Sequence, residues 1–223
     1  MLNKLVFVPA AAALALSLAF PSAAHAAITV YTTRASYLAA ISVPGVDTFD
    51  NLGPNDTLST PQNRTADAYA YTVSVAPNSI FFPVGSAGGD VWLSSNDRQD
   101  TITFDGFSAN VRGVGGYFFR TDIDGRLSGD YATINLSATD ASGTVTQALL
   151  NPSFTSFVGF VSTGEFTNIK LWVGDAGTGV PNVWAAANDL TLGVAAPIPE
   201  PETYALMLGG LALLTALARR KKA

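Results

Sequence analysis

The chain of 223 residues contains no cysteine and a single histidine, His25. Without cysteine it can form no disulfide, no thiolate zinc site and no thiol nucleophile. Basic side chains are scarce as well: residues 27–196 carry seven Lys or Arg against fifteen Asp or Glu, a net charge of about −8. Since nucleic-acid affinity depends on basic patches, this composition argues against a nucleic-acid partner.

The first 26 residues have the three zones of a secretory signal peptide. Lys4 supplies the positive charge near the start, residues 5–20 form an apolar run, and Ala24 and Ala26 make a small-x-small cleavage site. This pattern predicts export by the Sec machinery and cleavage after Ala26, with a retained membrane anchor as the alternative. Cleavage removes His25, which would exclude a Ser-His-Asp triad, a Cys-His dyad and the usual zinc sites.

The C-terminal segment, residues 197–223, places a proline-rich stretch before an apolar one. The triplet Pro199, Glu200 and Pro201 is followed by an apolar run at 203–218. Sixteen helical residues rise about 24 Å, close to the roughly 30 Å of a hydrocarbon core, which predicts a transmembrane helix. By the positive-inside rule, the four basic residues near the end of the chain should stay in the cytoplasm. They are Arg219, Arg220, Lys221 and Lys222.

The order of a Pro-Glu-Pro triplet, one apolar helix and a terminal basic cluster closely resembles the PEP-CTERM sorting signal. The resemblance covers residues 197–222 and implies recognition by an exosortase, a membrane-embedded transpeptidase-like enzyme. It further implies a Gram-negative host that makes exopolysaccharide, and a chain that passes through an inner-membrane intermediate to the cell surface or extracellular matrix. An ordinary membrane anchor behind a proline-rich linker is the alternative. Because many cargos share this tail, it does not assign a function to the exported body.

The middle of the chain, residues 27–196, is predicted to be one all-β domain. A short helix is expected over residues 34–41, with Thr33 as its N-cap and Pro44-Gly45 as its end. Turn pairs such as Ser142-Gly143 separate the short β-rich runs that follow, which predicts an antiparallel, jelly-roll-like β-sandwich. Strands are expected at 28–31, 46–50, 70–75, 79–82, 90–93, 101–104, 111–119, 132–138, 144–150, 157–162, 168–173 and 188–192.

This domain also resembles the carbohydrate-binding and lectin-like β-sandwiches that are often attached to PEP-CTERM tails. The strings that carry the resemblance are 113–119, 157–160 and 188–192. In many carbohydrate-binding jelly rolls the first and last strands share a structural Ca²⁺. By that resemblance Asp50 and Asp189 would be its carboxylates; two edge or turn aspartates are the alternative.

A second candidate calcium loop follows from the residues themselves. Asp122 and Asp124 alternate in a tight glycine turn, and such a turn can direct several oxygen atoms at one hard cation. The loop lacks the third aspartate and the final glutamate of an EF-hand. A solvated hairpin turn is therefore the alternative.

Trp172 is the candidate platform for a sugar ring. It alternates in phase with Lys170 and out of phase with Ile169, Leu171 and Val173, so it should point out of the sheet. A tryptophan within the core is the alternative. Trp92 and Trp184 are weaker candidates for the same role.

These observations predict an exported, non-enzymatic protein of the cell surface or matrix, whose sandwich binds exopolysaccharide. A secreted polysaccharide-acting enzyme that uses a pair of aspartates is one alternative, because carboxylates are the only hydrolytic groups left. A purely structural matrix protein with no ligand is the other.

Overall fold

The computed structural model describes residues 27–85, 89–174 and 182–197. The predicted signal peptide and transmembrane helix lie outside these residues, as does the predicted sorting signal except for Pro197. Within the described part of the chain, no helix is long and apolar enough to cross a membrane.

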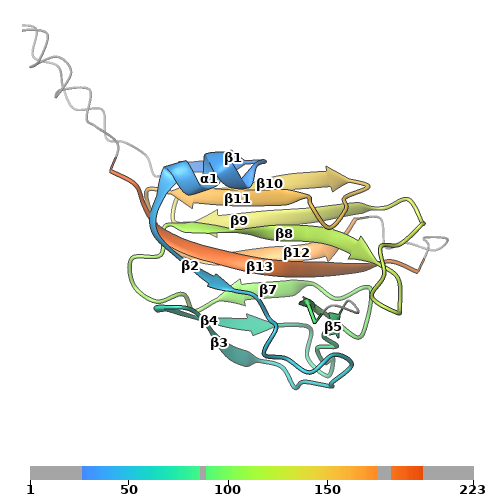
Figure 1. Cartoon of the computed structure of the whole chain (residues 1–223). Helices are drawn as coiled ribbons and strands as arrows, with labels where there is room; N and C mark the ends of the chain where they lie inside the picture. Colours follow the sequence, from blue (N-terminus) through green and yellow to red (C-terminus); the bar gives the residue numbers. More distant parts are fainter. Residues whose placement is uncertain (1–26, 86–88, 175–181, 198–223) are drawn as a thin grey trace, which may run out of the picture.

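The described residues form one short helix and a series of short strands (Figure 1). In chain order the elements are β1 (Ile28–Tyr31), α1 (Arg34–Ala40), β2 (Ile41–Asp47), β3 (Gln62–Ala66), β4 (Tyr69–Ser74), β5 (Val84–Gly85), β6 (Val91–Ser94), β7 (Ile102–Asp105), β8 (Gly113–Thr121), β9 (Thr133–Asp140), β10 (Gly143–Leu150), β11 (Phe157–Ser162), β12 (Phe166–Val173) and β13 (Trp184–Ala195).

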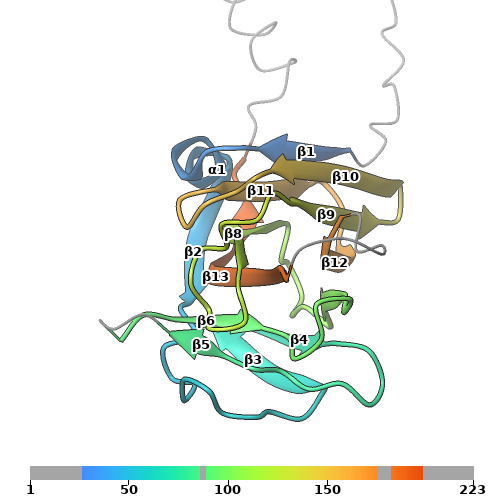
Figure 2. The same ribbon diagram turned by 90° about the vertical axis from the view of Figure 1, so that its right-hand side faces the viewer.

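The strands build two antiparallel sheets that enclose one core (Figures 1 and 2). The seven-stranded sheet has the order β1-β11-β8-β13-β6-β5, with β2 also paired to β13, and the six-stranded sheet has the order β10-β9-β12-β7-β4-β3. From β6 onward the chain changes sheet at every connection except the β9–β10 hairpin. The predicted antiparallel β-sandwich is therefore confirmed, and the repeated changes of sheet give it its jelly-roll-like character.

The core forms because alternate residues of each strand point inward. In β12, Ile169 and Leu171 are fully buried, whereas Lys170 between them is exposed. Their partners in the core include Phe104 of β7 and Leu190 of β13. Both sheets thus contribute apolar rows to one continuous cluster, and the alternate residues of each strand point away from this cluster.

The predicted N-cap of α1 is confirmed, because the Thr33 side chain accepts a hydrogen bond from the backbone N–H of Ser36. The predicted end of the helix was wrong. The helix stops at Ala40, and Pro44-Gly45 lies inside β2. A register shift between β2 and β13 accommodates this proline, since β2 pairs on one side only and prolines are tolerated in edge strands at such irregularities.

Tyr37 of α1 packs on the outer face of the seven-stranded sheet over Gly115 and Gly159, which we call the glycine floor. Its hydroxyl donates a hydrogen bond of 2.8 Å to the carbonyl of Thr191, and its side chain is fully buried. A Cβ placed on Gly159 would overlap the ring of Tyr37, and one on Gly115 would lie 3.1 Å from it. These glycines, which belong to the strings that suggested a lectin-like domain, are needed to seat the helix.

Other differences from the predicted strands lie where side-chain composition is a poor guide. β3 was not predicted, because its sequence is almost entirely polar. The expected strand at 79–82 forms only isolated bridges from Phe81 to Leu58 and Ser95. β13 begins four residues earlier than the predicted 188–192, because a run of buried alanines continues the pairing with β8.

We expect Gly159→Ala to destabilise the fold by about 1–3 kcal/mol, because the added methyl group overlaps the Tyr37 ring and forces the helix away from the sheet. Chemical denaturation of the 27–196 body measures this change. Gly129→Ala is the matched control, since nothing lies within 4 Å of a Cβ at Gly129. Equal stability of the two variants would contradict the role given to the glycine floor.

Candidate functional site

A groove of about 510 Å³ lies on the outer face of the six-stranded sheet. Thr103 of β7, Ser137 of β9, and Lys170 and Trp172 of β12 contribute to its floor, and Asp100, just before β7, contributes to its wall. Trp172 is half-buried and lies on the same side of β12 as the exposed Lys170. The outward orientation expected for Trp172 is thus present; its contact with a sugar stays a prediction.

The register of three neighbouring strands aligns the polar groups of this groove. Lys170 is paired with Thr103 on one side and with Ser137 on the other. Paired residues of antiparallel strands lie on the same face, so the two hydroxyls flank the lysine in one row. Trp172 stands two residues further along β12, on the same face. The result is an aromatic ring beside a row of hydrogen-bonding groups.

Asp100 was not predicted as a site residue. It is buried, it accepts a hydrogen bond from the Ser79 hydroxyl, and burial raises its pKa although that hydrogen bond opposes the shift. Among the described residues, no ion-pair partner faces Lys170. The groove therefore combines an ammonium group that forms no ion pair within the described part of the chain, a carboxyl group, two hydroxyls and an aromatic ring.

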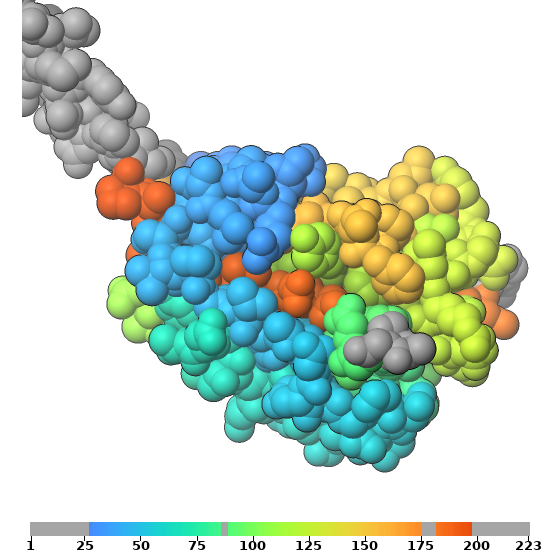
Figure 3. All heavy atoms as spheres, in the orientation of Figure 1, coloured from blue at the N-terminus to red at the C-terminus, as the bar shows by residue number. Residues whose placement is uncertain are grey.

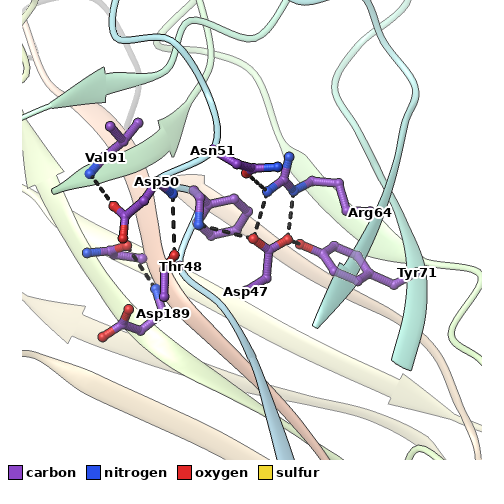
Figure 4. A network of polar contacts seen from close by, with 10 residues as sticks. Asp47, Thr48, Asp50, Asn51, Arg64, Tyr71, Val91 and Asp189 are labelled. Atoms are coloured by element: carbon purple, nitrogen blue, oxygen red, sulfur yellow. Dashed lines mark hydrogen bonds and ion pairs between the residues drawn. The ribbon is translucent and has the colours of Figure 1, made fainter. Parts of the chain in front are cut away.

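Asp50 and Asp189 lie in the same region of the structure (Figure 4). Asp47 at the end of β2 pairs with Leu190 of β13, which places Asp50 near the irregularity where Asp189 adopts a φ of 48°. The pKa of Asp189 is raised, first by burial and then by the negative charges of Asp90 and Asp50. Three carboxylates thus share one region of the surface.

Two of these carboxylates, those of Asp50 and Asp90, accept hydrogen bonds within the protein. Asp50 Oδ1 accepts a hydrogen bond of 2.9 Å from Val91 N, and Asp90 Oδ1 accepts one of 3.0 Å from Asn188 Nδ2. Within the described ranges, no group of three or more His, Cys, Asp or Glu side chains is arranged to hold a metal ion. Calcium at Asp50 and Asp189 stays a prediction from resemblance.

The loop containing Asp122 and Asp124 has the geometry of a solvated turn. Asp122 Oδ1 accepts backbone hydrogen bonds from Asp124 and Arg126, at 3.0 and 2.9 Å. The Asp124 carboxylate forms an exposed ion pair of 2.8 Å with Arg126. Both carboxylates thus interact with groups of the same turn, and this geometry favours the hairpin alternative over a calcium loop.

A buried polar network that sequence analysis did not find lies beside the aspartate region (Figure 4). Arg64 of β3 donates two hydrogen bonds of 2.7 Å to the carboxylate of Asp47, and Tyr71 of β4 donates one of 2.6 Å to the same group. The Arg64 guanidinium also lies 5.0 Å from the ring centroid of Phe49. No spacing rule links these residues, and the network joins β2 to the edge of the other sheet.

Comparison with known families assigns the C-terminal tail. Residues 197–222 match the model of the PEP-CTERM protein-sorting motif. The chain carries a PEP-CTERM sorting motif. The resemblance noted for the tail is therefore confirmed, and it marks an exported protein that is sorted by an exosortase, a membrane protein. Comparison with curated proteins and with solved structures found no match, and the lectin-like resemblance of the body stays a prediction.

The body presents the start of the PEP-CTERM motif next to its own first residues. The last strand, β13, ends beside α1, where Ala196 N donates a hydrogen bond of 2.9 Å to Ala40 O. Ala27 and Pro197 line the same apolar groove at this end of the sandwich. We call this end, which comprises the start of β1, α1 and the end of β13, the terminal pole. In Figure 3 the last described residues lie against the α1 region.

We expect Asp189→Asn to raise the free energy of unfolding at neutral pH, by less than about 1 kcal/mol because the side chain is partly exposed. The raised pKa means that the native state binds a proton more readily than the unfolded state, so stability falls as pH rises between the two values. Below the ordinary value of 3.8 both variants are neutral there and the difference should vanish. Asparagine tolerates the positive φ at this position.

Thermal melts in Ca²⁺ and in chelator test the calcium prediction with the same variant. If Asp50 and Asp189 bind Ca²⁺, the wild-type midpoint rises with Ca²⁺ and that of Asp189→Asn does not. Asp124→Asn is the control for the other candidate loop. A wild-type midpoint that is unchanged by chelator would contradict both calcium sites.

Proposed function

We propose that the chain is a non-enzymatic protein whose β-sandwich binds exopolysaccharide at the cell surface or in the extracellular matrix of a Gram-negative bacterium. It leaves the cytoplasm through the Sec machinery and is held in the inner membrane by its C-terminal helix. The exosortase then recognises Pro199, Glu200 and Pro201. The observation that carries the binding role is the row of Thr103, Lys170 and Ser137 beside Trp172.

The chemistry of a sugar ring fits this arrangement. One face of a pyranose is apolar because of its C–H groups, and it can stack on the exposed side of Trp172. The hydroxyls at the rim of the ring need both donors and acceptors. Thr103 and Ser137 supply both, Lys170 supplies donors, and Asp100 supplies an acceptor. A shallow, open groove also suits a polymer, whose chain must enter and leave.

A polysaccharide-acting enzyme is the alternative of a different class. Glycoside hydrolysis commonly requires two carboxyl groups about 5–10 Å apart across the scissile bond. Asp100 is the one acidic residue among the described residues that line the groove. This supports binding over hydrolysis at the groove, and an enzyme would need a pair of aspartates elsewhere, such as Asp50 and Asp189.

Trp172→Ala should weaken binding to exopolysaccharide purified from the producing bacterium by about thirtyfold, the loss of about 2 kcal/mol that is typical of a buried tryptophan contact. Affinity electrophoresis of the 27–196 body measures the change. Trp184→Ala is the matched control, because Trp184 is also half-buried but lines a different pocket.

Binding that both variants retain would contradict the groove as the binding site, and no binding by the wild type would favour a purely structural protein. Release of reducing ends from the same polysaccharide tests for an enzyme. Sustained release that is lost in Asp50→Asn or Asp189→Asn would favour the hydrolase.

A further inference from the structure

Only a short stretch of chain separates the terminal pole from the Pro-Glu-Pro triplet of the sorting motif. β13 is paired with β2 as far as Ala195, and Ala196 is hydrogen-bonded to Ala40. The sorting triplet begins at Pro199, only three residues beyond Ala196. Three fully extended residues span at most about 11 Å. A protein that binds the triplet therefore comes within that distance of the folded body.

The segment that connects Ala196 to the triplet is rich in proline. Pro197, Pro199 and Pro201 alternate with single residues. Proline fixes φ and disfavours the helical conformation in the residue that precedes it, so this sequence favours an extended connection. A protein that holds the triplet is therefore expected to lie beside the terminal pole.

The pole presents a mainly apolar groove of about 320 Å³ at this point. Tyr31 of β1, Ala39 of α1, Val161 of β11 and Pro197 are among the residues that line it, and every described side chain of the lining is uncharged. Ala27 lines it as well, so the predicted cleavage after Ala26 adds a single charge there, the new α-ammonium group. The nearby Arg112 and Glu165 form an ion pair with each other at 3.1 Å. On a body with a net charge of about −8, the side chains of this groove form a neutral surface.

The chemistry of the groove favours a protein over a lipid surface as its occupant. Anionic headgroups attract clusters of Lys and Arg, and no described lining residue is basic. An apolar concavity with a polar rim is typical of a protein–protein contact. The exosortase is the membrane protein that the sorting motif brings to this distance.

We propose that the terminal pole is a docking surface for the exosortase, which contacts the apolar groove beside α1 while it binds Pro199, Glu200 and Pro201. The enzyme thus recognises a surface of the folded body as well as the tail. This inference rests on the sorting motif and is independent of saccharide binding at Trp172.

Site-specific photo-crosslinking in the producing bacterium tests the proposal on the full chain. A photoreactive amino acid replaces Thr163, an exposed residue of the groove, or Thr57, an exposed residue in the connection between β2 and β3. That connection lies at the opposite end of the body from α1 (Figures 1 and 2). We expect adducts with the exosortase from position 163 and none from position 57.

A charge substitution provides a second readout. Ala39→Glu keeps a good helix former in α1 but places a charge in the groove, so the fraction of protein that reaches the cell surface should fall. Thr57→Glu should leave that fraction unchanged, and thermal melts of both bodies check that folding is intact.

Adducts that contain only phospholipid or a second copy of the chain would overturn the proposal, as would equal surface delivery of Ala39→Glu and Thr57→Glu. Glu200→Ala separates this failure from failure of the sorting role. If Glu200→Ala is delivered normally, the triplet is not what the exosortase recognises, and the docking proposal falls with it.

Discussion

The two-residue period of a β-strand is the constraint on which the candidate site depends. Ile169 and Leu171 are fully buried in the shared core, and this burial forces Lys170 and Trp172 to the outside of the same strand. Cross-strand pairing then aligns Thr103 and Ser137 with Lys170. A shift of β12 by one residue would place the lysine and the tryptophan in the core, so the energy of the core also fixes the composition of the groove.

The alternation of side chains along each strand also makes the two outer faces of the sandwich differ. On the seven-stranded sheet, the outward positions Gly115 and Gly159 carry no side chain, and Tyr37 of α1 fills that space. The face is therefore covered where the helix lies. On the six-stranded sheet no described helix covers the outward row of β12. This leaves its polar and aromatic side chains accessible, and the helix instead helps to form the terminal pole, from which the PEP-CTERM tail begins.

Local patterns in the sequence predicted those features that depend on neighbouring residues alone. Alternation in β12 gave the outward face of Trp172, and the Thr33 cap gave the start of α1. Features that depend on distant contacts were missed. Asp100 lies outside any strand, and it joins the groove only through the packing of its loop, which no local pattern reports. The alanines at the start of β13 have low strand propensity and pair because β8 and β6 lie on either side.

We propose that the exported body binds exopolysaccharide through the outward row of the six-stranded sheet. Amide NMR spectra of the 27–196 body, titrated with exopolysaccharide fragments from the producing bacterium, test it most directly. We expect shifts confined to β7, β9, β12 and the loop of Asp100, with the glycine floor and the Asp50–Asp189 region unchanged. Shifts centred on those two regions, or none at saturating polysaccharide, would contradict it.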